Sequence, residues 1–399
     1  MLPRLISILG MLLIIGSAFL FSSNRKKVSW RIVIWGTTLQ IIFALLILKT
    51  TPGMKIFQWA QIFFNKIYEF TGHGTQFLIG QKMSEVNTAV SICAVLIFIS
   101  SLMAILYYLR VIQVLVYAMA KLMKVTMKIS GAESLGAAMF IFMGIEAITG
   151  LKKFIREMTS SELLTIMTGF MATIAGTVMA IYVGVFGAEA GHLLAASIMS
   201  APAAIMLSKI LLPETEVPAT SGDINWKEIK SDDVNVIDAA ASGASDGMKL
   251  SLNIAAMLLA FVAIIGMLDS LLTYMNTSFG EISGYLLSPV AFIMGVPWSD
   301  CLEVGKLLGI KVVFNEFISY QQLQQLAVSG TISPRSITIA TYALCSFANF
   351  GSLAILIGGI GGLCPERKRE TAKLGIKALF AGFLAGCMTA TVAGFLLNS

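Results

Sequence analysis

The chain has 399 residues, of which 57% are hydrophobic and 13% are charged, and its formal net charge is +6. Soluble domains carry about 25% charged residues, so this composition excludes a soluble globular protein and indicates a chain that crosses a membrane several times. The two histidines stand alone and the five cysteines have no metal-ligand spacing, which argues against a zinc enzyme or a disulfide framework. The positive charge gathers in short segments between apolar runs, as in cytoplasmic loops, so it does not require a nucleic-acid partner.

Residues 1–128 are predicted to form a scaffold of three membrane spans and two amphipathic helices that lie along the membrane surface. The spans are 5–21, 32–48 and 89–109, and the amphipathic helices are 54–70 and 110–128. A basic triplet, Arg25-Lys26-Lys27, follows the first span in place of a cleavage-site pattern. This arrangement predicts an uncleaved first helix whose N-terminus lies outside the cell.

Residues 129–212 are predicted to form a first repeat of one hairpin and two spans. The apolar run 135–151 is interrupted by Gly144 and Glu146, and basic residues flank both of its ends. Two cytoplasmic ends cannot belong to a simple span, so we expect a re-entrant hairpin with Glu146 near its tip. The next span, 163–187, is interrupted by polar and small residues at 173–177, and 192–212 returns to the cytoplasm.

Residues 213–249 are polar and predict a cytoplasmic linker, and 250–280 predict one further scaffold helix. Residues 281–399 are predicted to form a second repeat of one hairpin and two spans. Its hairpin comprises the runs 285–296 and 300–320, separated by Pro297-Trp298. The span 337–362 is interrupted at 347–352, and the last span, 371–397, leaves the C-terminus outside.

The most informative stretch is 309–320, which places Lys311, Asn315 and Glu316 inside an apolar region. An ionisable group at membrane depth costs roughly 2.5–3.5 kcal/mol, so such groups usually line a cavity or a pathway. The alternative is that Glu316 forms a structural pair with Lys311, but this leaves Asn315 unexplained. Each half of the chain therefore has a hairpin with a Glu followed by an interrupted span. The pattern predicts an inverted repeat with a substrate site at the repeat interface, although Gly and Ser at helix-packing contacts are an alternative explanation.

The runs GIKVVFNEFISY at 309–320 and SFANFGS at 346–352 resemble the signatures of the concentrative nucleoside transporter family. The runs GYLLSP at 284–289 and GVPWSD at 295–300 are also similar to that family. The resemblance implies an all-α membrane protein with about eight transmembrane helices, two re-entrant hairpins and an inverted repeat. It also implies a homotrimer in the cell membrane that imports nucleosides by an elevator-type movement driven by an ion gradient.

The same resemblance implies the residues of the substrate site. Glu316, Asn349 and Ser352 would bind the ribose, while Phe347 and Asn315 would lie beside it. In the first hairpin the family has Gly-Gln-Thr-Glu or Gly-Gln-Ser-Glu, whereas this chain has Met143-Gly144-Ile145-Glu146. Glu146 is kept and Val178 fits a base-lining position, but Gly144 and Ile145 replace the polar groups that face the base. Because fewer polar groups relax discrimination, we expect purine nucleosides to be accepted at least as well as pyrimidine nucleosides.

The coupling ion is predicted from one further departure. Sodium-coupled members place an Asn seven residues before the hairpin Glu, where this chain has Met139, and a thioether is a poor ligand for a hard cation. We therefore expect proton coupling, with Glu146 and Glu316 as the candidate carriers. Sodium held by Thr173 and backbone oxygens is the alternative. No metal or other cofactor is expected.

Two other classes of function were weighed. A membrane-embedded enzyme needs a nucleophile–base pair or paired acids in a fitting motif, and no His or Asp is so placed, so we expect no enzymatic activity. A channel is less compatible with an inverted repeat that carries one buried carboxylate in each half, because this arrangement favours alternating access.

Overall fold

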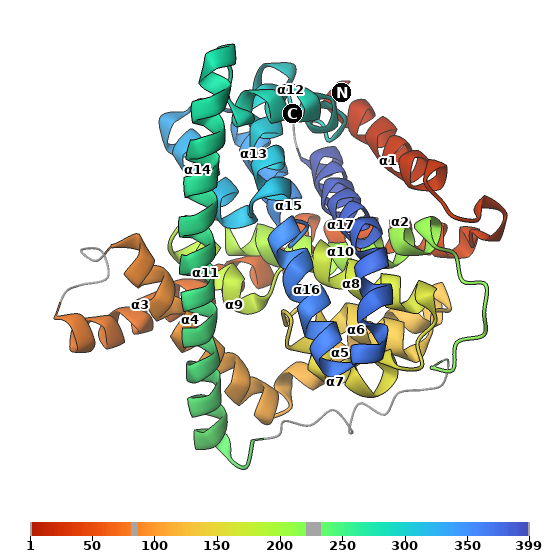
Figure 1. Ribbon diagram of the computed structural model, residues 1–399, viewed down its shortest axis with the longest axis horizontal. Coiled ribbons are helices and arrows are strands. Elements are labelled where there is room, and N and C mark those ends of the chain that lie inside the picture. Colours follow the sequence, from red (N-terminus) through yellow and green to blue (C-terminus); the bar gives the residue numbers. More distant parts are fainter. Residues whose placement is uncertain (1, 81–86, 221–232, 398–399) are drawn as a thin grey trace.

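The computed structural model describes residues 2–80, 87–220 and 233–397, and the regular secondary structure in these ranges is entirely helical (Figure 1). The prediction of an all-α membrane protein is thereby confirmed. Six of the described helical segments are long and apolar enough to cross a membrane, and three shorter apolar helices accompany them. The number of spans, about eight, stays a prediction.

The helices predicted to form the scaffold are the first five and one long helix from the middle of the chain. Thr50 begins α3 by accepting a hydrogen bond from the Gly53 N–H, and Gly80 ends it with φ +77°. This helix is therefore longer than the amphipathic stretch predicted at 54–70. The scaffold helices are α1 (Leu2–Leu20), α2 (Trp30–Lys49), α3 (Thr51–Ile79), α4 (Thr88–Tyr108), α5 (Val111–Met127) and α11 (Val236–Leu272).

Helices α4 and α11 pack against each other along much of their length. Two glycines on α11 allow this close approach: a Cβ at Gly243 would lie 2.6 Å from the Ser100 carbonyl oxygen, and one at Gly247 would lie 2.7 Å from Ile97 Cα. Helix α11 also begins well before the predicted span at 250, because the Asn235 side chain accepts hydrogen bonds from two N–H groups of its first turn. The predicted linker is correspondingly shorter, and its residues 221–232 lie outside the described residues.

The first repeat contains the hairpin and the interrupted span that the sequence predicts. Its two hairpin helices have nine residues each, about 13 Å of helix, so neither can cross a hydrocarbon layer of about 30 Å. The interrupted span breaks at residues 173–175. The helices of this repeat are α6 (Gly131–Met139), α7 (Ala147–Ile155), α8 (Ser160–Ala172), α9 (Gly176–Gly184) and α10 (Ala190–Leu211).

The second repeat differs from its prediction in one respect. The segment 300–320 is not one hairpin arm, because it breaks at Phe314–Asn315 into two helices. Asn315 caps the second of these by accepting a hydrogen bond from the Ile318 N–H at 3.0 Å. The motif residues therefore lie at a hairpin tip, and α12 packs along the first arm. The helices of this repeat are α12 (Phe279–Ile293), α13 (Cys301–Val313), α14 (Glu316–Ser329), α15 (Pro334–Leu344), α16 (Phe350–Leu363) and α17 (Lys368–Leu396).

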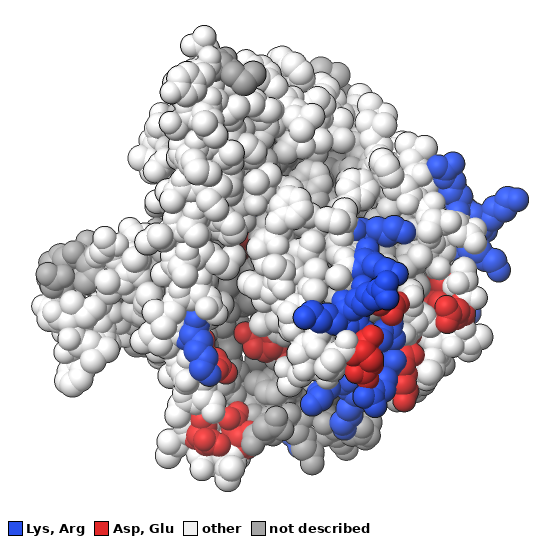
Figure 2. Space-filling model, in the orientation of Figure 1, with Lys and Arg blue, Asp and Glu red and all other residues white. Residues whose placement is uncertain are grey.

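The two hairpins lie toward opposite ends of the molecule, with α6 and α7 at the lower end and α13 in the upper half (Figure 1). Both chain termini lie at the upper end. Lysine and arginine side chains gather on the right of the same face, over the start of α17 and at the right edge beyond α1, with acidic side chains among them lower down, while the top of the face is nearly free of charge (Figure 2). This asymmetry agrees with the positive-inside pattern that the sequence predicts.

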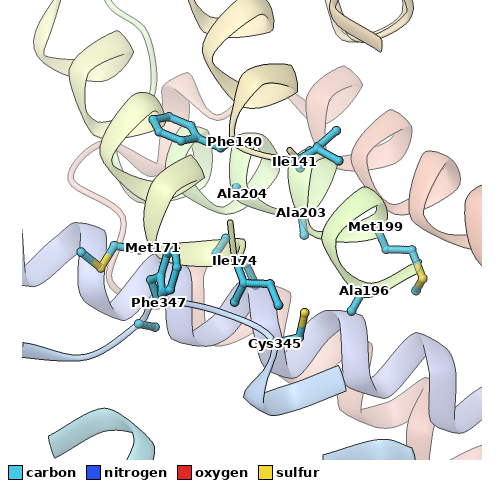
Figure 3. Close-up of a cluster of buried hydrophobic side chains, with 14 of the residues drawn as sticks. Phe140, Ile141, Met171, Ile174, Ala196, Met199, Ala203, Ala204, Cys345 and Phe347 are labelled. Atoms are coloured by element: carbon cyan, nitrogen blue, oxygen red, sulfur yellow. The ribbon is translucent and has the colours of Figure 1, made fainter. Parts of the chain in front are cut away.

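The core lies where the interrupted spans meet α10. Alanines on α10 allow the other backbones to approach closely, and apolar side chains from both helix breaks fill the remaining space. Figure 3 shows this packing for Phe140, Ile141, Met171, Ile174, Ala196, Met199, Ala203, Ala204, Cys345 and Phe347, all of which are buried.

Candidate functional site

The broken segments of the two repeats contact one another through the backbone. The Phe347 N–H donates to the Thr173 carbonyl oxygen at 3.1 Å, which joins the break between α15 and α16 to the break between α8 and α9. The Gly176 N–H donates to the Phe142 carbonyl oxygen at 3.1 Å, which joins the second of these breaks to the first hairpin. Non-helical backbone is thus paired inside the protein, as it must be at membrane depth.

Glu316 is the centre of the polar contacts at this junction. This residue is the first of α14, and it is only 3% exposed. Its Oε2 accepts a hydrogen bond from Asn349 Nδ2 at 2.7 Å, and its Oε1 accepts one from the Tyr182 hydroxyl at 3.0 Å. Asn349 caps α16 through its Oδ1, which accepts from the Ser352 N–H at 2.7 Å. The carboxylate is therefore held between a hairpin tip and two interrupted spans.

A cavity of about 100 Å³ opens beside this carboxylate. Eight of the predicted substrate-site residues lie along its wall, and they come from both hairpins and both interrupted spans. Asn349 is absent from the lining but fixes two groups that belong to it, Glu316 and Ser352. The predicted residues that line the cavity are Gly144, Ile145, Glu146, Val178, Asn315, Glu316, Phe347 and Ser352.

The first hairpin closes part of the space that a longer side chain would need. A Cβ at Gly144 would lie 3.0 Å from Glu146 Oε2 and 3.1 Å from Ala175 Cβ, so this position has little free volume. The end of Ile145 lies near Gly359 on α16, where a Cβ would be 3.2 Å from Ile145 Cδ1. The altered hairpin tip is thus partly filled by its neighbours.

Lys311 does not form the structural pair with Glu316 that we considered as an alternative. Its ammonium is fully buried and donates to the Ala343 carbonyl oxygen at 2.7 Å and to Ser346 Oγ at 2.5 Å. Both acceptors belong to the end of α15 and the break that follows it. Lys311 therefore fastens the hairpin arm α13 to the segment that carries Phe347 and Asn349.

Neither Met139 nor Thr173, the two residues compared with the sodium site of the family, is among the residues that line the cavity. Thr173 is buried, and its hydroxyl donates to the Gly169 carbonyl oxygen at 2.9 Å. Met139 is 1% exposed and ends α6. In contrast, the two candidate proton carriers, Glu146 and Glu316, both line the cavity.

Several residues of the site were not predicted from the sequence. Thr177 lines the cavity, and its buried hydroxyl has no hydrogen-bond partner among the described residues. It lies in the polar break that the sequence indicates, so it could have been found there. Helix α11 also contributes a wall of the cavity. Its side chains are as apolar as lipid-facing ones, so the sequence does not distinguish the cavity-lining residues Leu250, Ile254, Met257 and Leu258.

Two hairpins and two interrupted spans that meet at a largely apolar cavity with a buried carboxylate, Glu316, in its wall define the architecture of a secondary transporter. Comparison with known families agrees. The family model described as "Na+ dependent nucleoside transporter C-terminus" matches residues 192–394, its N-terminal counterpart matches 9–82, and a model described as "Nucleoside recognition" matches 89–189. The chain belongs to the concentrative nucleoside transporter family, which is a family of transporters and not of enzymes.

Curated relatives resemble nearly the whole chain. Solute carrier family 28 member 3 of Eptatretus stoutii is 41% identical over 98% of this chain and 60% of its own length. Solute carrier family 28 member 3 of Homo sapiens is 39% identical over 99% of this chain and 60% of its own length. Sodium/nucleoside cotransporter 1 of Mus musculus is 36% identical over 98% and 64%. The chain thus spans about three fifths of the length of the curated relatives it matches.

Solved structures have the same fold. The structure of CNTnw in an inward-facing substrate-bound state is 37% identical, covers 98% of each chain and has a TM-score of 0.92. An outward-facing state of a double variant of CNTnw is 36% identical, covers 99% of this chain and 97% of its own, and has a TM-score of 0.93. The fold is therefore shared with a protein that has been captured in both orientations.

Proposed function

We propose that this protein imports nucleosides across the cell membrane by alternating access, driven by an ion gradient. The observation that carries the proposal is the convergence of Glu316 and Asn349, from two separate helix breaks, beside one cavity. A carboxylate and an amide at this spacing can bind two neighbouring hydroxyl groups. Buried polar groups also reject a substrate that leaves them unpaired. The names of the family model and of several relatives support the same activity.

The proposed sugar subsite consists of Glu316, Asn349 and Ser352, with Asn315 and Phe347 beside it. The proposed base subsite lies toward the first hairpin and contains Glu146, Gly144, Ile145 and Val178. The free hydroxyl of Thr177 adds one polar contact on that side. With few other polar groups facing the base, purine nucleosides should be accepted at least as well as pyrimidine nucleosides.

Sodium is one proposed coupling ion. The matching family is described as sodium-dependent, and the relatives include two sodium/nucleoside cotransporters. Thr173 supports sodium coupling. Its hydroxyl donates a hydrogen bond to the Gly169 carbonyl oxygen, but the lone pairs of the hydroxyl oxygen can still coordinate a cation.

The proton is the second candidate, and it is favoured by the buried Met139, which has no oxygen to offer a hard cation. Glu146 and Glu316, the carboxylates in the cavity wall, are the proposed carriers. As partners we propose the lipid bilayer and two further copies of the chain in a homotrimer. Both termini would lie on the outside.

Uptake of a radiolabelled nucleoside into proteoliposomes tests the proposal. Accumulation should saturate, should require an imposed ion gradient and should be strongly reduced by Glu316→Gln. Sodium coupling predicts that uptake stops when choline replaces sodium. Proton coupling predicts that uptake persists in choline and collapses with a protonophore. Accumulation that ignores both gradients, or that is unchanged in Glu316→Gln, would contradict the proposal.

A further inference from the structure

Tyr182 is a buried polar side chain that neither the sequence motifs nor the comparisons assign to the site. It lies on α9 and is fully buried. Its ring stacks on Tyr320 of α14 at a centroid distance of 4.2 Å, and it contacts the Phe317 ring edge-to-face at 5.2 Å. Its hydroxyl points away from this aromatic packing toward Glu316 Oε1, to which it donates at 3.0 Å.

The hydrogen bonds of Glu316 explain why this donor matters. A carboxylate has about four acceptor positions, two on each oxygen. Tyr182 takes one on Oε1, and Asn349 takes one on Oε2. These hydrogen bonds still leave acceptor positions on the carboxylate, which can receive neighbouring hydroxyl groups of a sugar. Because its two donors come from different helices, the plane of the carboxylate is fixed before any substrate arrives.

We propose that Tyr182 is a positioning residue that orients Glu316 for two adjacent sugar hydroxyls, and that it thereby sets the discrimination between ribonucleosides and deoxynucleosides. The proposal rests on the proposed function as a nucleoside transporter. Without the Tyr182 hydroxyl, the carboxylate is fixed on one side only. The binding free energy that Glu316 contributes to each sugar hydroxyl then falls, because part of that free energy must order the Glu316 side chain.

The chain provides a matched control in Tyr320. This side chain is also a buried tyrosine and belongs to the same aromatic stack, but its hydroxyl donates to the Thr341 backbone oxygen at 2.7 Å and not to Glu316. Replacing either tyrosine by phenylalanine removes one hydroxyl from a buried bond and keeps the ring. A general loss of stability should therefore affect both variants, whereas a loss of Glu316 orientation should affect only Tyr182→Phe.

The experiment compares wild type, Tyr182→Phe and Tyr320→Phe in proteoliposomes. It measures inhibition of labelled nucleoside uptake by adenosine, 2′-deoxyadenosine and 3′-deoxyadenosine. Tyr182→Phe should weaken adenosine binding about tenfold, as expected for a hydrogen bond to a charged group. The substitution should weaken binding of the deoxy analogues less, so the ratio of the adenosine affinity to the affinity of each deoxy analogue should shrink. Tyr320→Phe should keep the wild-type ratio.

The outcomes separate this inference from the function on which it rests. Failure of the wild type to accumulate any nucleoside contradicts the proposed function. If the wild type accumulates nucleosides but Tyr182→Phe keeps the wild-type ratio, or if both variants change it equally, only the role of Tyr182 is refuted. Should Tyr182→Phe not fold, 3-fluorotyrosine at position 182 keeps the ring and hydroxyl but changes donor strength. A changed ratio then supports the role, and an unchanged ratio overturns it.

Discussion

Replacement of Lys311 by methionine tests how the second hairpin is fastened to the site. The substitution keeps most of the side-chain length but removes the donor to the Ala343 carbonyl oxygen and to Ser346 Oγ, at 2.7 and 2.5 Å. A buried acceptor left without its partner costs about 1–3 kcal/mol, so two such groups predict a loss of at least about 2 kcal/mol. The break that carries Phe347 and Asn349 should also loosen, so substrate affinity should fall together with stability.

Lys306→Met is the matched control, because it lies on the same helix. Lys306 is partly exposed and pairs with Glu303 at 2.8 Å within one turn, an arrangement that contributes about 0–1 kcal/mol. Unfolding of the purified protein in detergent, followed with and without nucleoside, measures both effects. If Lys311→Met costs no more than Lys306→Met, then the buried ammonium does not hold the hairpin to the break.

Two further predictions concern the substrate directly. Asn349→Ala should weaken nucleoside binding at least tenfold, far more than the ~0.6 kcal/mol of an average hydrogen bond between membrane helices; unchanged affinity with lowered thermal stability would assign Asn349 to helix packing. In a competition assay, inosine and guanosine should inhibit uptake at least as well as uridine and cytidine, because Gly144 and Ile145 present no polar side chain to the base. A wide advantage for the pyrimidine nucleosides would show that Thr177 or another neighbour restores base discrimination.

The sequence predicted the helix breaks more reliably than it predicted how they meet. Glycine, proline and polar residues inside apolar runs identified the interrupted spans and the first hairpin, because each such residue weakens a membrane helix in a way that is visible locally. The break at Phe314–Asn315 was missed, although Asn followed by Glu is a usual start of a helix.

Contacts between distant segments were beyond the sequence for a physical reason. Tyr182 and Glu316 are 134 positions apart, and nothing in the composition of α9 shows which way the Tyr182 hydroxyl points. Lys311 was close enough along the helix to suggest Glu316 as its partner, yet its hydrogen bonds go to α15 and the adjoining break. The apolar residues of α11 could not be assigned from the sequence either, since the same residue types suit a cavity wall and a lipid-facing surface.

A last prediction concerns Glu214, which follows α10 in the polar segment predicted to be a linker outside the membrane. Its side chain accepts hydrogen bonds from Lys209 Nζ at 3.1 Å and from the Thr159 hydroxyl at 2.8 Å, while Lys209 also pairs with Glu133 at 2.6 Å. These contacts join the start of the predicted linker to α6 and to the first turn of α8. Partial burial acts to raise the pKa of Glu214, but Lys209, Thr159 and the Glu216 N–H together hold this pKa below its ordinary value.

The sign of the pH dependence follows from that lowered pKa. A carboxyl group whose pKa is lower in the folded protein adds stability at pH values above its ordinary pKa, near 4.5, and loses this contribution as the pH falls through the lowered value. Thermal unfolding in detergent between pH 7 and pH 3.5 should therefore show a steeper fall for wild type than for Glu214→Gln, which is less stable at neutral pH by roughly 1 kcal/mol. Glu216→Gln, an exposed neighbour, should follow the wild-type curve. If Glu214→Gln and wild type lose stability in parallel across this range, then Glu214 does not stabilise the junction between the linker and the first repeat.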